Sequence, residues 1–528
     1  MLRSILSILT LFSLVFPTTA QSLSSVNADM GKLEGEAKQT WHLQGLKSVK
    51  AYGVQSDKTS VELVGDKIPA KRIVVAVIDS GVDHEHEDLK ENIWVNADEI
   101  AGNGVDDDGN GFIDDVNGWN FLVDDQGEEM VYANLEATRV LRLSKSLESS
   151  GEPYPNWLTK EVLESAAEIF NKNTRELNGY YQIVGVYRKV DSAVISVLKD
   201  TAYTYEHVKA ISSENPMIKD AKRIFEVFEK LKIEKSELRE LDQLVVKYTE
   251  YWLNMEYQPR AEVNFVKDSY GNNHVGGKHT GHGTHVAGII AANASNDLGG
   301  RGIASTVADI MILKVVPDGD ENDMDVAAAI RYAADNGANI INMSFGKGLS
   351  PGQSEVNKAL EYAASKNVLI VHAAGNDAEN NDEVDNYPND DQLSEMAQAS
   401  FLCIGAIGPR KNKDMLASFS NYGAASVDLF APGEDIYATL PGSKYGYRSG
   451  TSMAAPVVSG VAALIWAYHP ELSSADLRSV LIEGGVDIAK KKVVLPGTKK
   501  DKVRFGSITT SGKVVNAYSS FEKAGSIK

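Results

Sequence analysis

Cysteine and positive charge are both scarce in this chain. Its 528 residues include one cysteine, Cys403, so no disulfide can form within the chain. Cys403 lies in the apolar segment SFLCIGAIG, which is typical of a packed strand residue rather than a nucleophile. Lys and Arg number 53 against 73 Asp and Glu, which gives a net charge of −20. Since binding of nucleic acid relies on neutralising phosphates with Lys and Arg, this balance argues against nucleic acid as a partner.

Long hydrophobic runs are also few, and the clearest one is N-terminal. Arg3 precedes an apolar run over residues 5–16, and the small residues TTA follow at 18–20. This pattern predicts a signal peptide over residues 1–20, cleaved after Ala20, because the run is too short for a comfortable membrane span. No later segment reads as a membrane span, so we expect a secreted or periplasmic protein.

Several continuous β-branched runs begin at residue 72 and alternate with helix-like stretches. The runs are RIVVAVIDSG (72–81), ADIMILKVV (308–316), ANIINMSFG (338–346), NVLIVHAAGN (367–376) and FLCIGAIG (401–408). Runs without polar alternation indicate strands buried on both faces, as in a parallel sheet covered by helices. We therefore expect an α/β fold of three layers, with a mainly parallel sheet flanked by helices. In such sheets, chemistry gathers at the carboxyl ends of the strands.

One hydroxyl stands out in the segment YRSGTSMAAP (447–456). Ser452 is surrounded by small residues and precedes an apolar helical stretch over 455–468. A serine at a helix N-terminus has free backbone amides beside it, and small neighbours let a substrate backbone approach. Serine needs an oriented base to act as a nucleophile. His282 in HTGHGTH and Asp79, at the end of a buried strand, are the candidate base and its orienting acid.

Five motifs together resemble the subtilisin-like serine proteases (subtilases, peptidase family S8), of the exported bacterial type. They are VIDSGVDHEHEDL, HGTHVAG, MSFG, AAGN and GTSMAAP, in the order Asp, His, Ser known for subtilisin. The resemblance covers roughly 70–125 and 265–520. It implies that Ser452 is the nucleophile, His282 the general base and Asp79 its orienting residue. It also implies that Asn376 and the Ser452 N–H form an oxyanion hole.

The same resemblance predicts where a substrate binds. The strand over 342–346 is expected to pair with an extended substrate backbone. The predicted substrate-binding residues are Ser344, Phe345, Gly346, His372, Ala373 and Gly375. The segment Asn386, Tyr387 and Pro388 is expected at the base of the pocket for the residue before the scissile bond (P1). No carboxylate is clearly placed there, which favours a large apolar or broad preference.

An acidic loop over 105–117 (VDDDGNGFIDDVN) has the spacing of a calcium-binding loop. The candidate ligands are Asp106, Asp108, Asn110, the Phe112 carbonyl and Asp114. Asn117 stands where such loops place a bidentate Glu, and Asp115 is a candidate extra ligand. Oxygen donors at alternate positions suit a hard cation, so we expect structural calcium. The alternative is an acidic turn without a metal.

A second cation site is expected only from the resemblance. Asp88 matches the aspartate that helps subtilases bind calcium together with the loop after the His helix. In this chain that loop is 293–305, and Asn293 and Asn296 are its candidate ligands. The HTGHGTH segment offers a different metal site, of His279, His282 and His285, but no carboxylate joins it in a recognised spacing.

The chain departs from the subtilase pattern between Asp79 and His282, where a block over 126–261 is inserted. It is rich in Glu, Lys, Leu and Ala, and Leu238, Leu241, Val245 and Tyr248 fall on one helical face. We expect an α-helical subdomain of three to five helices that either gates substrate access or decorates the surface. The predicted domains are the signal peptide 1–20, an N-terminal part of the peptidase domain 21–125, this insertion 126–261, and the rest of the peptidase domain 262–528.

The stretch before residue 71 leaves little room for a folding propeptide. The segment WHLQGLKSVKAYG reads as the start of the peptidase domain, so we expect folding without a cleaved inhibitory domain. Three functions remain open: an active endopeptidase on protein or peptide substrates, a catalytically blocked calcium-stabilised binding homologue, and a peptide ligase or cyclase using the same triad. The sequence does not predict an oligomeric state.

Overall fold

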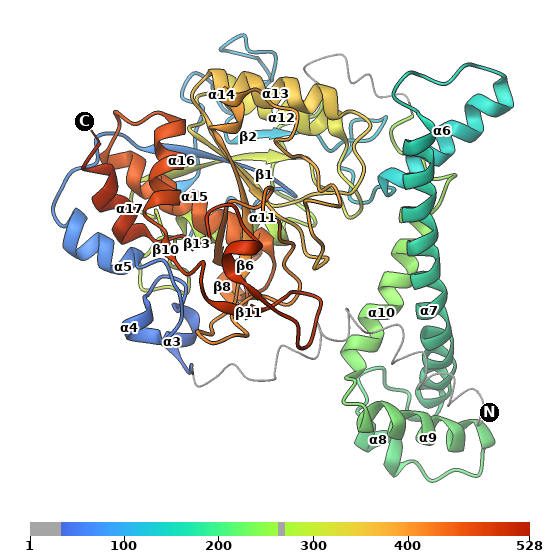
Figure 1. The fold of residues 1–528 in the computed structure, drawn as a ribbon. Helices are drawn as coiled ribbons and strands as arrows, with labels where there is room; N and C mark the ends of the chain where they lie inside the picture. Colours follow the sequence, from blue (N-terminus) through green and yellow to red (C-terminus); the bar gives the residue numbers. More distant parts are fainter. Residues whose placement is uncertain (1–32, 262–269, 528) are drawn as a thin grey trace. The chain divides into compact units, whose positions relative to one another are not determined.

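The computed structural model describes residues 33–261 and 270–527 (Figure 1). The predicted signal peptide lies outside these residues. Residues 137–257 form one compact unit, here called the helical unit. The described residues before and after it form a second, called the larger unit. The boundaries of the helical unit fall inside the expected insertion 126–261.

A nine-stranded sheet forms the centre of the larger unit. Its strands, in spatial order, are β10 (Val486–Asp487), β13 (Lys513–Val514), β7 (Leu429–Pro432), β6 (Phe401–Ile407), β5 (Leu369–Ala373), β4 (Ile340–Met343), β1 (Ile73–Asp79), β3 (Ala308–Lys314) and β2 (Gly118–Asn120). All neighbours pair in parallel except β10 with β13. The predicted mainly parallel sheet is therefore confirmed.

Two hydrophobic cores cover the two faces of this sheet, which gives the predicted three layers. In β1, Val75 and Val77 pack with α11 (Gly281–Ala291) and α15 (Thr451–Tyr468) in one core. Ala76 and Ile78 point the other way, into the core with α12 (Asp323–Asp335) and α13 (Gln353–Ser365). Both faces of the strand are apolar because both are covered, which explains the absence of polar alternation in its sequence.

The most apolar helix of the described residues is α15. Its length and composition would allow it to cross a membrane, yet 89% of the relevant window is buried inside the protein. It packs against β4, β5, β6 and β7 from one face of the sheet. Its hydrophobicity is therefore that of a core helix, and it does not indicate a membrane span.

The segment before β1 belongs to the larger unit. Short helices follow one another there, namely α3 (Glu36–Gln39), α4 (Leu46–Val49), α5 (Ser56–Thr59) and the π-helical turn η2 (Ser60–Val64). Trp41 is fully buried in the main core, and its indole N–H donates to the carbonyl oxygen of Asp435 (3.1 Å). This segment therefore packs into the core of the larger unit.

The helical unit has a hydrophobic core of its own. It contains α7 (Lys160–Leu198), α8 (Tyr205–Ala210), α9 (Pro216–Lys230), α10 (Lys235–Lys247) and the π-helical turn η4 (Tyr248–Trp252), preceded by α6 (Glu136–Ser150). Leu238, Leu241, Val245 and Tyr248 are all buried in that core, as their helical spacing predicts. Asn215 caps α9 by accepting the N–H of Met217, so this helix begins where a capping residue precedes a proline.

The remaining elements surround the sheet. They are η3 (Lys90–Asn92), α14 (Glu395–Gln398), the hairpin β8 (Ile436–Leu440) and β9 (Lys444–Arg448), α16 (Ser474–Glu483), the pair β11 (Lys492–Val494) and β12 (Lys502–Arg504), η5 (Phe505–Ser507) and α17 (Ala517–Ala524). The hairpin β8–β9 leads directly into α15.

The order of strands reverses around β1, and this reversal positions the site. After β1 the chain builds β2 and β3 on one side and then crosses to β4 and the later strands on the other. The carboxyl ends of β1 and β4 therefore open a crevice, because their connections leave in opposite directions. Asp79 ends β1, and Ser344 directly follows β4.

Candidate active site

A buried carboxylate holds an imidazole at the end of β1. His282, the second residue of α11, makes two contacts through Nδ1, to Oδ1 (2.8 Å) and Oδ2 (3.0 Å) of Asp79. The Asp79 side chain is 1% exposed, whereas that of His282 is 33% exposed. Since a carboxylate only accepts hydrogen bonds, Nδ1 must carry the proton and Nε2 offers a lone pair. This is the tautomer that a general base requires.

Ser452 lies over the neighbouring strand end. Its Oγ donates to the carbonyl oxygen of Ser344 (2.9 Å), and Ser344 Oγ donates back to the carbonyl oxygen of Ser452 (2.9 Å). The register pairs Ile78 with Met343, so Asp79 and Ser344 are the next residues on two adjacent strands, whose spacing is about 4.8 Å. The fold thus brings Ser452 and the Asp79–His282 pair to one edge of the sheet. In this structure the hydroxyl of Ser452 donates to the carbonyl oxygen of Ser344.

Asn376 is attached to the start of the helix that carries Ser452. Its Oδ1 accepts the backbone N–H of Thr451 (2.8 Å) and the Thr451 hydroxyl (3.1 Å). Because the oxygen is held by an N–H, the amide orientation is fixed and Nδ2 remains a donor. Thr451 Oγ1 also accepts the N–H of Gly375 (3.1 Å), which ties the end of the β5 loop to the same turn.

The predicted substrate-binding residues belong to two neighbouring segments, 344–346 and 372–375. A Cβ at Gly346 would stand 2.6 Å from Asn386 Oδ1, and Asn386 Nδ2 donates to the carbonyl oxygens of Ala373 (3.3 Å) and Ala374 (3.0 Å). Asn386 therefore bridges the two segments. Gly375 has φ +108°, a conformation that favours glycine, and Asn386 lies 3.6 Å from the position of its missing Cβ.

His372 is buried beside the segment expected to form the P1 pocket. It is 1% exposed, and its Nε2 contacts the carbonyl oxygen of Phe345 (2.7 Å). Burial lowers the pKa of His372 to about 4, so the ring is neutral at neutral pH and donates to this oxygen. His372 lines a small cavity together with Asn386 and Pro388, the segment expected at the base of the P1 pocket, and it also holds the carbonyl oxygen of Phe345.

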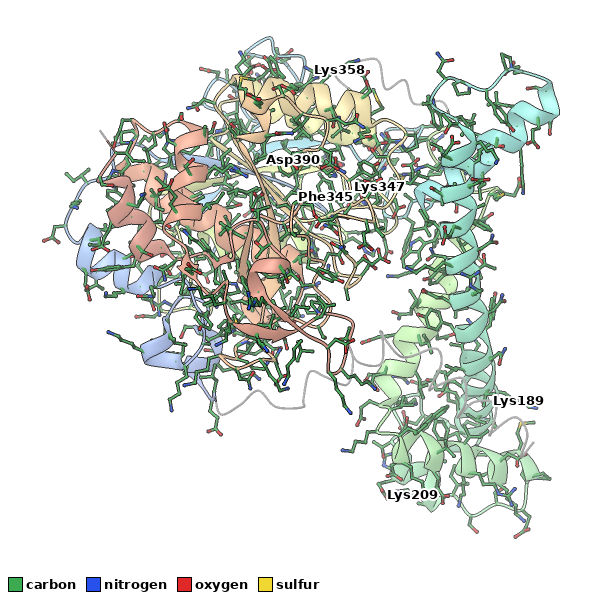
Figure 2. The ribbon with its side chains drawn as sticks, viewed as in Figure 1. Lys189, Lys209, Phe345, Lys347, Lys358 and Asp390 are labelled. Carbon is green, nitrogen blue, oxygen red and sulfur yellow. The ribbon has the colours of Figure 1, made fainter. Side chains whose placement is uncertain are left out.

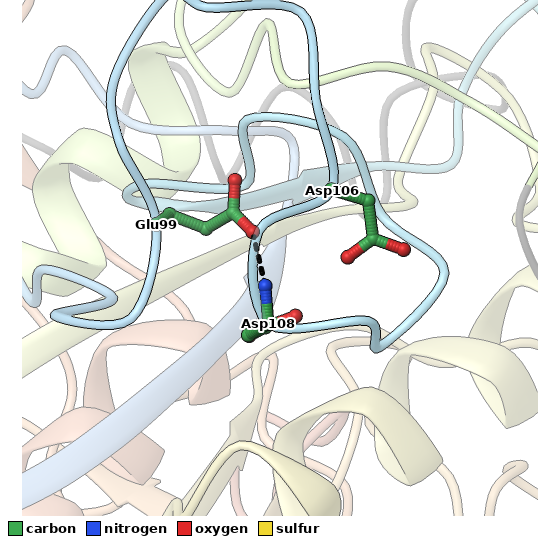
Figure 3. Close-up of side chains that lie close together, drawn as sticks. All are labelled: Glu99, Asp106 and Asp108. Atoms are coloured by element: carbon green, nitrogen blue, oxygen red, sulfur yellow. Dashed lines mark hydrogen bonds between the residues drawn. The ribbon is translucent and has the colours of Figure 1, made fainter.

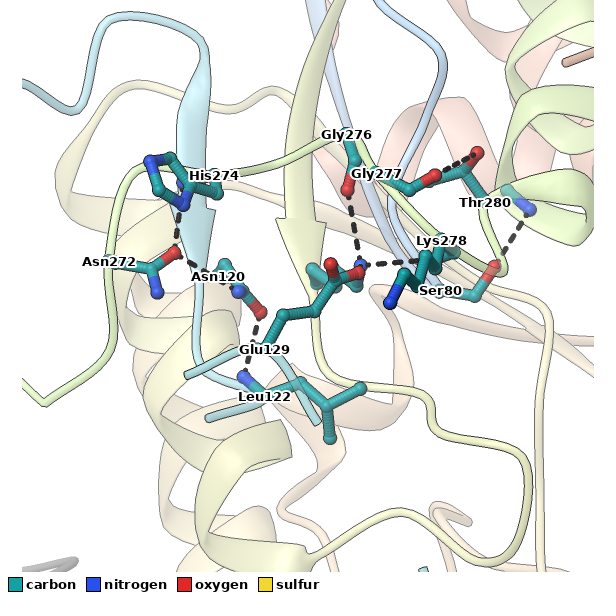
Figure 4. Close-up of polar contacts among 12 residues, drawn as sticks. Ser80, Asn120, Leu122, Glu129, Asn272, His274, Gly276, Gly277, Lys278 and Thr280 are labelled. Carbon is teal, nitrogen blue, oxygen red and sulfur yellow. Dashed lines mark hydrogen bonds and ion pairs between the residues drawn. The ribbon is translucent and has the colours of Figure 1, made fainter. Parts of the chain in front are cut away.

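A buried lysine fixes the segment that precedes His282. Lys314 ends β3, in register with Asp79, and only 2% of its side chain is exposed. Its ammonium contacts the carboxylate of Glu129 and donates to the carbonyl oxygens of Gly276 (3.2 Å) and Lys278 (3.4 Å) (Figure 4). The loop leading into α11 is therefore held by a charge at the end of the neighbouring strand. Sequence analysis missed the pair of Lys314 and Glu129, because no motif in either segment indicates that the two residues are in contact.

The three histidines of HTGHGTH do not converge. His285 is buried with its Nε2 on the carbonyl oxygen of Gly446 (3.2 Å), and burial lowers its pKa to about 3. His282 is held by Asp79, and the ring of His279 packs edge-on against that of Tyr132. Separate partners for the three rings exclude the three-His metal site.

Part of the predicted calcium loop gathers carboxylates. Oxygens of Glu99, Asp106 and Asp108 all lie within 4.8 Å of one another (Figure 3). Glu99 Oε1 also accepts the N–H groups of Asp107 (2.8 Å) and Asp108 (3.2 Å). Three hard oxygen donors fit calcium or a similar cation. Glu99 was missed because it stands six residues before the loop, outside the spacing pattern.

The other predicted ligands of this loop have different roles. Asp114 turns away, and its two oxygens accept the N–H groups of Asn103 (3.1 Å) and Gly104 (2.9 Å). Asn110 stays beside the cluster, with its Nδ2 on Asp108 Oδ2 (3.0 Å) and its Oδ1 accepting the Phe112 N–H (2.8 Å). The structure thus brings the carboxylates of Asp106 and Asp108 together with that of Glu99, whereas Asp114 contacts Glu99 only through its backbone N–H (3.1 Å).

The second expected cation site is organised by N–H donors. Asp88 is buried, and its oxygens accept Asn296 Nδ2 (2.8 Å) and the N–H of Gly300 (2.7 Å). Asn293 instead donates its side-chain amide to Glu91 (2.9 Å). The described contacts make Asp88 the anchor of the 293–300 loop, and they do not turn its oxygens and those of the two asparagines toward a common point.

Known proteins resemble this chain in sequence. The sequence profile of the subtilase family (Peptidase_S8) matches residues 70–493. The thermophilic serine proteinase of Bacillus sp. (strain AK1) is 40% identical over 184 residues, which are 35% of this chain and 42% of that protein. The major intracellular serine protease of Bacillus subtilis (strain 168) is 37% identical over 241 residues, 43% of this chain and 70% of that protein. The solved structure of sphericase is 33% identical and covers 45% of this chain and 77% of its own, with a TM-score of 0.37. The chain thus spans less than half the length of the first of these relatives.

Proposed function

The chain belongs to the subtilase family, and we propose that it is a serine endopeptidase that hydrolyses peptide bonds through an acyl-enzyme. The observation that carries this proposal is the two-point contact of Asp79 with His282 Nδ1, at 2.8 and 3.0 Å, beside the strand end over which Ser452 lies. A serine next to an imidazole oriented by a buried carboxylate is the arrangement that activates a hydroxyl for attack.

Each member of the triad has a separate task in this proposal. Ser452 Oγ attacks the scissile carbonyl carbon while His282 Nε2 takes its proton. The imidazolium then donates that proton to the leaving amine, and the same imidazole activates water to release the acyl group. Asp79 stays ionised throughout, since it stabilises the positive charge on His282 and does not itself accept the proton.

The developing oxyanion is assigned two donors. One is Asn376 Nδ2, which is oriented because Oδ1 of the same amide is held by Thr451. The other is the backbone N–H of Ser452, in the first turn of α15, where no carbonyl precedes it to accept an intrahelical bond. Both donors are positioned before the reaction, which is the condition for stabilising a transition state electrostatically.

A neutral P1 side chain suits the proposed pocket. Asn386 carries an uncharged amide. This side chain lies between the segments 344–346 and 373–375 and fills part of the space between them. A strong preference for Arg or Lys would need a carboxylate at this position. We therefore propose a preference for apolar or mixed P1 residues in protein or peptide substrates.

We also propose that the protein binds structural calcium and that it is exported. Glu99, Asp106 and Asp108 would hold the ion, which would supply charge neutralisation to the loop and take no part in the reaction. The apolar run over 5–16 supports export, and millimolar extracellular calcium would suffice for a weak site.

Fluorophosphonate labelling tests the proposal. We expect the purified protein to be labelled at Ser452 in calcium, with no labelling of Ser452→Ala and much slower labelling of Asp79→Asn. Product analysis with an added amine separates hydrolysis from ligation, since a ligase transfers the acyl group to the amine. A folded protein that is not labelled in calcium would overturn the proposal and favour a blocked binding homologue.

A further inference from the structure

The substrate-binding segment ends at a lysine whose charge is buried. Only 3% of the Lys347 side chain is exposed. Its Nζ donates to Glu136 Oε2 (2.6 Å) and to the carbonyl oxygen of Glu321 (2.8 Å), and it forms an ion pair with Asp323 Oδ1 (2.9 Å). An ammonium has three protons to donate and no acceptor, so these oxygens suit it. Because oxygen atoms surround this buried charge, the Lys347 ammonium is held in one position.

The backbone of the same residue is fixed as firmly as its side chain. The N–H of Lys347 donates to the carbonyl oxygen of Tyr387 (3.2 Å), and the N–H of Tyr387 donates back to Lys347 (2.9 Å). Lys347 and Phe345 are labelled close together in Figure 2, and the carbonyl oxygen of Phe345 is held by His372 (2.7 Å). Any shift of the Lys347 ammonium would therefore displace the segment 344–346 that is proposed to pair with substrate.

The acceptors of Lys347 come from two helix starts. Glu136 is the first residue of α6, the helix that continues into the helical unit, and its N–H donates to Asp320 Oδ2 (2.7 Å). Asp323 is the first residue of α12, and its carboxylate also accepts the Ser350 hydroxyl (2.8 Å) and the Gly352 N–H (2.7 Å). The Lys347 ammonium thus joins the first residues of α6 and α12, both in the larger unit, to the turn after the substrate-binding segment.

We propose that Lys347 is a positioning residue for the substrate-binding segment, and that its pair with Glu136 couples this segment to the first turn of α6. The inference rests on the proposed endopeptidase function. Removing Glu136 from this buried ion pair would leave part of the Lys347 charge uncompensated, so the segment and the helix start stabilise each other. Such coupling is reciprocal: what orders the segment also orders the first turn of α6.

Kinetics on two kinds of substrate test the positioning role. Extended peptides pair with 344–346, whereas a small ester such as p-nitrophenyl acetate reaches Ser452 without that pairing. In Glu136→Gln we expect kcat/KM for an extended peptide to fall about tenfold, mostly through a higher KM, and hydrolysis of the ester to stay close to wild type. Glu136→Asp, which keeps the charge, should recover part of the loss. Lys358→Met, which breaks the exposed Glu355–Lys358 pair (2.6 Å) on α13, is the matched control and should change neither substrate.

Hydrogen exchange tests the coupling directly. A peptidyl chloromethyl ketone that occupies the segment should slow exchange of amides in the first turns of α6 in the wild type. In Glu136→Gln this added protection should disappear, while protection near Ser452 is kept.

Two results would overturn the inference. One is an equal loss for peptide and ester, with no change in α6 protection, which would make Lys347 an ordinary structural ion pair. The other is wild-type kinetics for Glu136→Gln on both substrates. Failure of the proposed function is a separate outcome, since the wild type would then not be labelled by a fluorophosphonate at all. If Lys347→Met does not fold, Glu136→Gln still decides, because its amide keeps an acceptor for the ammonium.

Discussion

The backbone N–H of Thr451 donates to Asn376 Oδ1 over 2.8 Å, so the residue before the proposed nucleophile orients the proposed oxyanion donor. The Thr451 hydroxyl extends this contact to the N–H of Gly375. One turn of chain thus sets the relative positions of Ser452 and Asn376. Preorganised donors of this kind need no rearrangement when negative charge develops, which is why they stabilise a transition state better than water does.

Replacing Asn376 by Leu should lower kcat by a factor of 10²–10³, about 3 kcal/mol, with little change in KM. The magnitude is the one known for subtilisin, a member of this family. The physical reason is that Nδ2 contributes only when the carbonyl oxygen becomes charged. Thr451→Val, which removes the hydroxyl and keeps the N–H, is the control and should lose far less. Steady-state kinetics on one peptide decide, and a change confined to KM would assign Asn376 to substrate binding instead.

Lys314→Met should destabilise the larger unit and slow the reaction. Its ammonium would no longer neutralise Glu129 or hold the segment before His282. Loss of one buried partner costs about 3–5 kcal/mol, and the low end applies because the Glu129 side chain is 24% exposed. Urea unfolding and kcat should be measured together. The double variant Lys314→Met with Glu129→Leu should regain most of the stability, and failure to regain it would mean that the carbonyl contacts matter more than the charge pair.

Glu321 should make stability depend on pH near neutrality. Burial raises its pKa to about 7, and Asp320 and Asp323 add to this while Lys347 opposes it. Between pH 4.5 and 7 the folded state keeps a proton that the unfolded state releases, so the free energy of unfolding falls as pH rises through this window. The effect is at most on the order of 3 kcal/mol, from a shift of two to three units.

Glu321→Gln removes this titration and should flatten the pH profile of stability between pH 5 and pH 8. Urea unfolding at several pH values gives the comparison. The exposed Glu355→Gln, on α13, is the control and should follow the wild-type profile. An unchanged profile in Glu321→Gln would show that other groups titrate in this window.

The positions of two candidate site residues on their elements follow from local sequence. Asp79 at the end of an apolar run and Ser452 at the start of a helix each have a signature within a few residues, and the sheet then brings their elements to one edge. The parallel sheet itself was predictable because strands buried on both faces lose their polar alternation.

Contacts that join distant segments were not predictable in the same way. The partners Lys347 and Glu136 stand far apart in the sequence and meet only because the insertion begins beside the end of β4. Likewise the loop spacing named Asp114 as a ligand, whereas backbone N–H groups of an earlier turn capture its carboxylate and Glu99 joins the cluster instead.

The acidic cluster should make thermal stability depend on calcium. Three carboxylates within 4.8 Å repel one another, and a bound cation removes this repulsion only in the folded protein, where the oxygens are gathered. At a calcium concentration a hundred times Kd, binding would add about 2.7 kcal/mol, which is readily seen as a shift of Tm between calcium and EGTA. Asp106→Asn and Glu99→Gln should each reduce this shift and raise Tm in EGTA. Asp98→Asn removes a neighbouring charge outside the cluster and should keep the wild-type response to calcium. If both cluster variants kept that response as well, the calcium site would lie elsewhere, and the loop would be an acidic turn held by its own backbone N–H groups.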